Sequence, residues 1–396
     1  MDFGFSPEEL EYQSRVRKFI DENFRPELET GISYIHGAGE DDQELLKHQK
    51  AFRQRLDDAG LLRVSWPKEF GGEGRSATYE YLLRLELEGR GLEPRVGMTL
   101  TSTVIAKYGT EEQKKEFLPR LLSRDIVMCA GFTEPRGGTD LAALETRAVR
   151  DGDDWVINGQ KIYTTGAEKA DFMWCLARTN KDAPKHDGIS IFMLDMSTPG
   201  VTVRPLRTMG NHLTSEVFLA DVRVPHSRLI GEENRGWYQN TLALDIERIT
   251  IGSYPAMKRF FDAVVEFAKE TEIGGKKLAD DPKVRLRLGE IAVDLEVLRQ
   301  ICNRNAWLGD AGQHSSIVAS MAKIWSSEFY YRMTNVATQI MGPFGQLQKG
   351  SKYAFLDGEV ELGYRNSPPS RFGGGANEVQ RDIIAKRGLG LPRSRR

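Results

Sequence analysis

The sequence predicts an α+β protein in which helical segments flank a central β-sheet region. In the first third, charged runs carry spaced apolar residues such as Phe52 and Leu56, the pattern of an amphipathic helix. From about Val127 to Trp237 the period changes to two between turn-forming Gly and Pro residues, and from Thr241 onward the helical period returns. We therefore expect a helical domain at 1–126, an antiparallel β-sheet domain at 127–238 and a helical domain at 239–396.

The N-terminal segment predicts a helix that begins near Ser6, because Pro7, Glu8 and Glu9 suit a first helical turn. The segment lacks the basic and apolar regions of a signal peptide, and no apolar run approaches the ~20 residues that span a bilayer. We therefore expect a cytoplasmic protein with no membrane partner.

Composition argues against several classes of partner. The 55 basic and 57 acidic residues nearly balance, which disfavours nucleic acid or an anionic membrane as the main partner. The three cysteines, Cys129, Cys175 and Cys302, form no Cys-x-x-Cys pair. They indicate a reduced compartment, and neither a metal site nor a disulfide framework.

The central region contains one strong turn signal among its candidate strands. Asn158-Gly159 is typical of a two-residue hairpin turn, and a hairpin there would present Tyr163, Thr164 and Thr165. The candidate strands are Thr146–Arg150, Trp155–Asn158, Ile189–Leu194, Val201–Arg204 and Val217–Val224. In the C-terminal region one apolar helix face comprises Ile246, Ile249, Met257, Phe260, Val264 and Phe267, and another comprises Ile291, Leu295, Leu298 and Cys302.

The segment Gly131–Asp140 combines a hydroxyl, a rigid Glu-Pro, two consecutive glycines and a Thr-Asp. Taken alone, it predicts a strand that ends in a turn, with Thr139 or Asp140 capping whatever follows. Glycines also let a backbone approach a ligand closely, and nearby amides and hydroxyls can donate to phosphate or to a heterocyclic ring. On composition alone the ordinary turn is the favoured interpretation.

This segment resembles the first signature of the acyl-CoA dehydrogenase family, G-hydrophobic-T-E-x-x-x-G-T-D, and the resemblance extends over nearly the whole chain. It implies FAD as cofactor, a helix–sheet–helix architecture ending in a four-helix bundle, and desaturation of an acyl-CoA to a trans-2-enoyl-CoA. Electrons would pass to an electron-transfer flavoprotein. The implied cofactor-binding residues are Phe132, Thr133, Gly138, Thr139, Tyr163, Thr164, Thr165 and Glu378.

The reaction needs a base, which should be a carboxylate whose pKa an apolar pocket raises. Many members of the family carry this glutamate near the C-terminus, where this chain has Gly374. A branch that includes isovaleryl-CoA dehydrogenase carries it in Leu-Asp-Leu-Glu-Arg, and this chain has Leu244-Asp-Ile-Glu-Arg248. The resemblance implies that Glu247 is the base, that Arg248 orients the helix end and that the Gly374 N–H polarises the thioester carbonyl. The alternative is that Glu247 is an exposed helix residue or pairs with an arginine.

The chain departs from the family where one subunit usually contacts the FAD of its neighbour. An Arg and a Phe are missing from Thr271–Lys276, and Pro343 replaces a glycine and supplies no N–H. The resemblance therefore favours the catalytic chain of an α2β2 heterotetramer with a paralogous subunit, as in steroid side-chain dehydrogenases, with a bulky, branched or steroid substrate. A homotetramer or homodimer remains the alternative, with lysines near 276–283 replacing the lost contacts.

Other functions on this fold remain open. An acyl-CoA oxidase or a flavin monooxygenase would share the implied FAD-binding residues. The presence of Glu247 disfavours a monooxygenase, which needs no such base. A non-catalytic partner subunit is disfavoured because Thr133, Thr139, Thr165 and Glu247 are all present.

Overall fold

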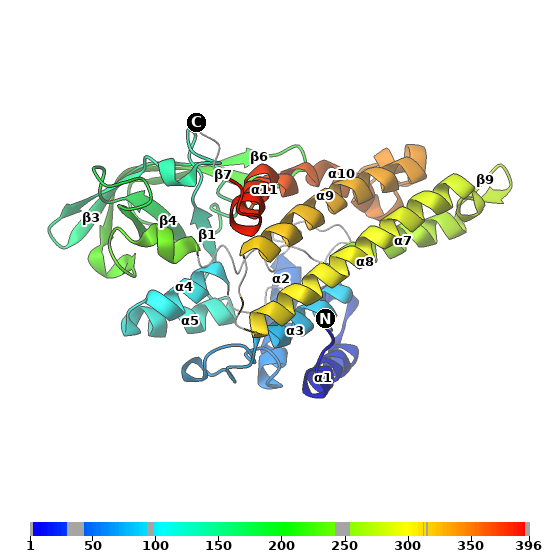
Figure 1. Ribbon diagram of the computed structural model, residues 1–396, viewed down its shortest axis with the longest axis horizontal. Helices are drawn as coiled ribbons and strands as arrows, with labels where there is room; N and C mark the ends of the chain where they lie inside the picture. The colour runs from blue at the N-terminus through cyan, green and yellow to red at the C-terminus, as the bar shows by residue number, and fades with distance from the viewer. Residues whose placement is uncertain are drawn as a thin grey trace. The chain divides into compact units, whose positions relative to one another are not determined.

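The computed structural model describes residues 3–29, 43–92, 99–241, 254–311, 313 and 316–392. The chain forms two compact units, one of Met1–Gly97 with Arg248–Arg396 and one of Met98–Glu247. The first unit is mainly helical, whereas the second contains the large sheet (Figure 1). The predicted class of helical ends around a central β region is confirmed.

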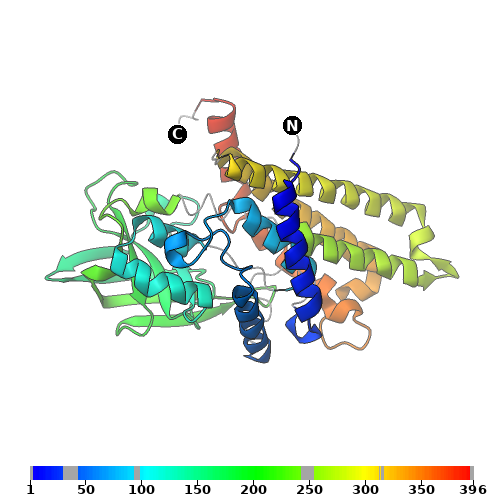
Figure 2. The ribbon, with the colours of Figure 1, turned by 90° about the horizontal axis from the view of Figure 1, so that it is seen from below.

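The helical unit is built from the two ends of the chain. Its long helices α7, α8 and α9 pack on one another, and α1 packs on α3, which also contacts α7 and α8 (Figures 1 and 2). The helices are α1 (Pro7–Asn23), α2 (Gln43–Asp58), α3 (Ala77–Gly89), α7 (Tyr254–Glu270), α8 (Pro282–Asp310), α9 (Ser316–Met341), α10 (Glu359–Asn366) and α11 (Asn377–Ile383).

The helix start predicted at Ser6 is confirmed. The Ser6 side chain accepts the Glu9 N–H, and the Glu9 carboxylate accepts the Ser6 N–H, which forms a capping box. The described residues of both predicted C-terminal apolar faces are buried: Met257, Phe260, Val264, Phe267, Ile291, Leu295, Leu298 and Cys302. Ile246 and Ile249 lie outside the described residues.

The sheet unit contains an eight-stranded sheet with the order β6-β7-β3-β2-β4-β5-β8, and β1 pairs with β4. Two helices of the same unit cover part of it, and the Phe117 ring of α5 packs edge-on against Phe172 of β4. The strands are β1 (Met128–Gly131), β2 (Arg147–Asp151), β3 (Asp154–Lys161), β4 (Phe172–Arg178), β5 (Ile189–Asp195), β6 (Val201–Arg207), β7 (Leu213–Pro225) and β8 (Leu229–Ile230). The helices are α4 (Leu100–Tyr108) and α5 (Glu111–Ser123).

Two details of the predicted sheet are wrong. The sheet is mixed, because β1 and β2 both pair with β4 in parallel, although its other pairings are antiparallel. Asn158-Gly159 is not a hairpin turn but lies inside β3, where the register against β7 shifts between Ile157 and Gly159. A Cβ at Gly159 would lie 2.3 Å from the Thr146 Oγ1, so the glycine permits close strand packing rather than a turn.

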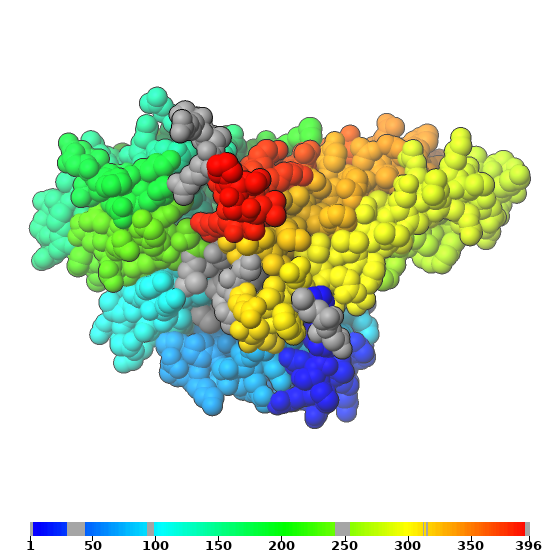
Figure 3. All heavy atoms as spheres, in the orientation of Figure 1, coloured from blue at the N-terminus to red at the C-terminus, as the bar shows by residue number. Residues whose placement is uncertain are grey.

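The departures from the family pattern lie at two surface turns of the helical unit. Residues 272–277 form a short hairpin of β9 (Glu272–Ile273) and β10 (Lys276–Lys277), which protrudes beyond α7 and α8 in the space-filling view (Figure 3). Gly274 and Gly275 both have positive φ there, as a tight hairpin turn requires. Pro343 lies in the 3-10 turn Gly342–Gln346 directly after α9.

Candidate functional site

The two predicted halves of the flavin cradle lie side by side in the sheet unit. One half is the segment after β1, and the other is the segment after β3. The Ile162 N–H donates to the Thr133 carbonyl at 2.9 Å, which joins the halves directly. The Thr164 N–H donates to the Ser215 carbonyl at 2.9 Å, which ties the second half to β7.

The second half alternates between surface and interior. Tyr163 is 65% exposed and has a left-handed backbone with φ of 58°, a conformation that costs a bulky residue roughly 1–3 kcal/mol. Thr164 is buried, and its hydroxyl has no hydrogen-bond partner among the described residues. Thr165 is exposed, with its hydroxyl 3.5 Å from the His212 Nε2. Tyr163 and Thr165 are therefore the side chains of this half that a ligand can reach from the surface.

The first half offers donors along an exposed glycine turn. Phe132 and Thr133 are half-buried, whereas Gly138 and Thr139 are exposed. No backbone carbonyl in the described part of the chain accepts the N–H of Gly138 or Thr139. Asp140 does occupy the N-cap of the following 3-10 turn, but its side chain makes no capping bond and instead pairs with Lys185 at 2.7 Å. The prediction that the Asp140 side chain caps the following turn is therefore wrong.

A buried ion pair that sequence reasoning missed underlies both halves. The Lys161 Nζ lies 2.7 Å from the Glu134 Oε1, and the two side chains are 0% and 5% exposed. The carboxylate also accepts the N–H groups of Glu145 and Thr146 at 2.5 and 3.0 Å. Burial acts to raise the pKa of Glu134, but the Lys161 charge and these hydrogen bonds outweigh it and hold the pKa below its ordinary value.

A signal for this pair was present in the sequence. Trp155, Ile157 and Lys161 occupy inward positions of β3 at the period of a strand. A lysine on the inward face of a strand needs buried acceptors, most favourably a carboxylate, because an unpaired buried ammonium is too costly. Glu134, within the family signature itself, supplies it.

The donor set of this cradle fits FAD. The backbone N–H groups of Gly138 and Thr139, which no described backbone carbonyl accepts, and the Thr139 hydroxyl suit phosphate oxygens. The half-buried Phe132 and the exposed Tyr163 supply aromatic surface, and the Thr165 hydroxyl is accessible for a ring heteroatom. The predicted residues of the sheet unit are thus gathered on two adjoining segments.

The other predicted site residues lie in the helical unit. Gly374 is exposed in a tight turn with φ of 66°, and Glu378 is exposed in the first turn of α11. Glu247 and Arg248 lie outside the described residues. The next glycine, Gly375, has φ of 94°, a backbone conformation that favours glycine, and a Cβ on it would displace the Gln380 amide, which lies 2.5 Å away.

A second buried lysine, also missed from sequence, anchors the Gly374 turn. Lys323 on α9 is 0% exposed and donates to the Arg371 carbonyl at 2.9 Å and to the Asn377 Oδ1 at 2.6 Å. The Asn377 amide in turn donates to the Ser327 hydroxyl and to the Glu328 carboxylate. The first and last residues of the segment 371–377 therefore both accept hydrogen bonds from the Lys323 ammonium.

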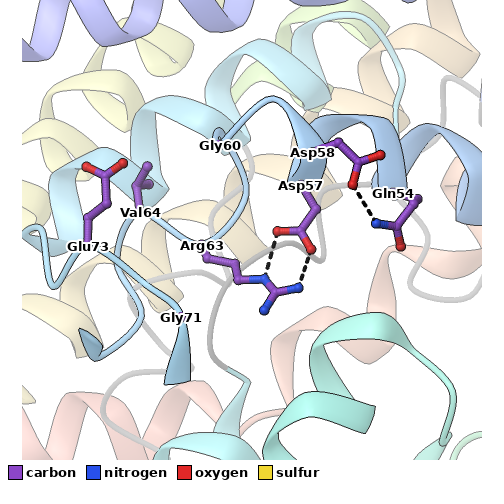
Figure 4. Close-up of a pocket in the computed structure, with 8 residues that line it drawn as sticks. All are labelled: Gln54, Asp57, Asp58, Gly60, Arg63, Val64, Gly71 and Glu73. Atoms are coloured by element: carbon purple, nitrogen blue, oxygen red, sulfur yellow. Dashed lines mark hydrogen bonds and ion pairs between the residues drawn. The ribbon is translucent and has the colours of Figure 1, made fainter. Parts of the chain in front are cut away.

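A pocket of about 340 Å³ near the end of α2 is unrelated to these residues (Figure 4). Its polar groups already have partners: the Arg63 Nε donates to Asp57 at 2.7 Å, the Gln54 amide donates to Asp58 at 2.8 Å, and Glu73 pairs with Arg75 outside the pocket. Within the described ranges, no cluster of three or more His, Cys, Asp or Glu side chains is arranged to hold a metal ion. None of the described helices combines the length and apolar character needed to cross a membrane.

Comparison with known proteins agrees with this architecture. Three family models match: acyl-CoA dehydrogenase N-terminal domain at residues 6–125, middle domain at 129–222 and C-terminal domain at 234–389. Acyl-CoA dehydrogenase FadE26 of Mycobacterium tuberculosis is 35% identical, and the match covers 100% of both chains. Two solved structures each match over 100% of both chains: the Tcur3481-Tcur3483 steroid ACAD, with TM-score 0.85 and 35% identity, and the ChsE4-ChsE5 complex from M. tuberculosis, with TM-score 0.84 and 34% identity. The chain therefore belongs to the acyl-CoA dehydrogenase family of flavoprotein oxidoreductases.

Proposed function

We propose that this chain is the catalytic subunit of an FAD-dependent dehydrogenase that converts a bulky, branched or steroid side-chain acyl-CoA to its trans-2-enoyl-CoA. The observation that carries the proposal is the 2.9 Å bond from Ile162 to Thr133, which joins two donor-rich segments into one cradle. Membership of the acyl-CoA dehydrogenase family supports the reaction type. The name of one similar structure, a steroid ACAD, supports the substrate class.

In the proposed mechanism, the two cradle segments bind and orient the cofactor, which supplies the hydride acceptor when bound. Glu247 would take the proton next to the thioester carbonyl, and Arg248 would have the orienting role that the family resemblance implies. The Gly374 N–H donates to the carbonyl oxygen, where negative charge develops as the proton leaves. Glu378 would help to hold the adenosine part of the cofactor, and electrons would pass on to an electron-transfer flavoprotein.

We also propose that a paralogous subunit completes the assembly. The hairpin at 272–277 and Pro343 replace the groups with which a subunit of this family usually contacts its neighbour's FAD. On α8, Leu286 and Val293 are 64% and 65% exposed beside a groove of about 940 Å³, and such apolar exposure is typical of a protein interface. The similarity to the ChsE4-ChsE5 complex supports a heteromeric assembly.

The decisive experiment for the reaction is anaerobic mixing of Glu247→Gln with a panel of acyl-CoAs from short chain to steroid. We expect the rate of flavin bleaching to fall by about 10²–10⁴ with the best substrate, the contribution typical of a positioned base. Glu266→Gln, at an exposed position of α7 that pairs with Lys269, is the matched control and should keep the wild-type rate. Flavin reduction within a few fold of wild type in Glu247→Gln would place the base elsewhere.

The assembly is tested separately by expressing the chain alone and together with paralogues encoded beside it. We expect the chain alone to lose flavin on purification and the co-expressed pair to retain it. A yellow, active homomer would refute the heteromer while leaving the proposed reaction intact.

A further inference from the structure

We propose that the buried Glu134–Lys161 pair is a positioning device that presents the Thr133 N–H to the flavin, an inference that rests on the proposed FAD cradle. Neither residue is exposed enough to touch the cofactor, since Lys161 is 0% and Glu134 5% exposed. Their effect must therefore pass through the backbone that they hold.

The Lys161 ammonium has three acceptors for its three N–H groups. It donates to the Glu134 Oε1 at 2.7 Å and to the Leu176 carbonyl of β4 at 2.7 Å, and it lies 3.5 Å from the Phe132 carbonyl. Glu134 accepts two backbone N–H groups as well as the ammonium. The pair therefore leaves neither charge unsatisfied, which is the condition under which a buried ion pair is tolerated.

The contact with Phe132 determines where the next N–H points. The Phe132–Thr133 peptide is planar and trans, so its C=O and N–H point in opposite directions. Because the carbonyl faces the buried ammonium, the Thr133 N–H faces away from it. The Thr133 carbonyl is itself fixed by the Ile162 N–H at 2.9 Å. Both peptides around Thr133 are thus held, and a positive charge on the carbonyl side strengthens the N–H as a donor.

Three variants separate positioning from simple stability. Lys161→Met leaves a buried carboxylate unpaired and should lower the melting temperature. The double variant Glu134→Gln/Lys161→Met buries no charge and keeps a carbonyl oxygen for one of the two N–H groups that Glu134 accepts on separate oxygens, so its melting temperature should return part of the way towards wild type. Arg223→Met removes an exposed ion pair with Asp151 on the same sheet and serves as the control.

Two readouts are measured on the full-length protein, alone or in the complex with which it co-purifies. The first is hydrogen exchange of the flavin-free protein, where we expect faster exchange at the Ile162 amide in both Lys161 variants and no change in Arg223→Met. The second is FAD affinity, where we expect the dissociation constant to rise about tenfold in the double variant, as for loss of one charge-assisted donor.

Each outcome decides the inference. Recovery of stability with persistently weak FAD binding and fast Ile162 exchange supports positioning. Wild-type FAD affinity in the double variant, or unchanged exchange at Ile162, overturns it while the proposed function stands. Failure of the wild-type protein to bind FAD in any assembly instead overturns the proposed function, and with it the role of the pair towards flavin.

Discussion

Replacing Lys323 by Met should destabilise the helical unit and loosen the turn that carries Gly374. Lys323 is 0% exposed, and its ammonium joins the Arg371 carbonyl to the Asn377 side chain. Methionine fills a similar volume but donates no hydrogen bond. The change therefore tests how much this buried ammonium contributes to holding residues 371–377.

The expected cost follows from the two bonds that are lost. A hydrogen bond from a charged donor contributes about 1.5–3 kcal/mol, so two contribute roughly 3–6 kcal/mol. Removal of a desolvated charge offsets part of this, and the Asn377 Oδ1 still accepts the Ser327 hydroxyl at 3.2 Å. We expect a net loss of about 2–4 kcal/mol, which at about 2–4 °C per kcal/mol corresponds to a fall in melting temperature of roughly 4–16 °C.

The assay is thermal unfolding of Lys323→Met beside Lys258→Met, with hydrogen exchange of residues 372–376 followed in both. Lys258 pairs with Asp262 on the exposed side of α7, so its loss should cost at most about 1 kcal/mol. A melting temperature for Lys323→Met equal to that of Lys258→Met, with unchanged exchange in the turn, would refute the anchoring role.

Two further predictions concern the cradle. Thr165→Val should raise the FAD dissociation constant about fivefold, because one hydrogen bond of about 1 kcal/mol is lost. The control Thr202→Val, at an exposed position of β6, should leave the dissociation constant unchanged. Fluorescence titration of the flavin-free protein with FAD measures both constants. Acidification should destabilise the sheet unit through Glu134, whose folded-state pKa lies below the ordinary value of 4.5. The stability that Glu134 contributes is fully present above the unfolded-state pKa and is lost as the pH falls through the lowered folded-state pKa. The free energy of unfolding in urea, measured between about pH 6 and about pH 3, should therefore fall more steeply on acidification in wild type than in Glu134→Gln/Lys161→Met. Equal slopes would exclude this carboxylate as the acid-sensitive group.

Local signals in the sequence predicted much of the fold because they act over a few residues. The Ser6 cap needs only Glu9 three positions later, and the apolar period of α7 buries Phe260 and Val264 as expected. The continuous apolar strand β4 was not among the predicted strands, although β5, which is also buried on both faces, was; both lack the alternation of a strand with one face towards solvent. Asn158-Gly159 was misjudged because a turn dipeptide also fits a β-bulge.

The sequence by itself determined the helix–sheet–helix class, the signature Gly131–Asp140 and the residue types that could serve a flavin. Only the tertiary structure decided that the turn after β1 meets the end of β3 through Thr133 and Ile162. It also decided that Lys161 and Lys323 are buried anchors rather than surface charges. The physical reason is that a lysine is buried only where distant carboxylates and carbonyls converge on its ammonium, and that convergence is a property of chain segments far apart in sequence.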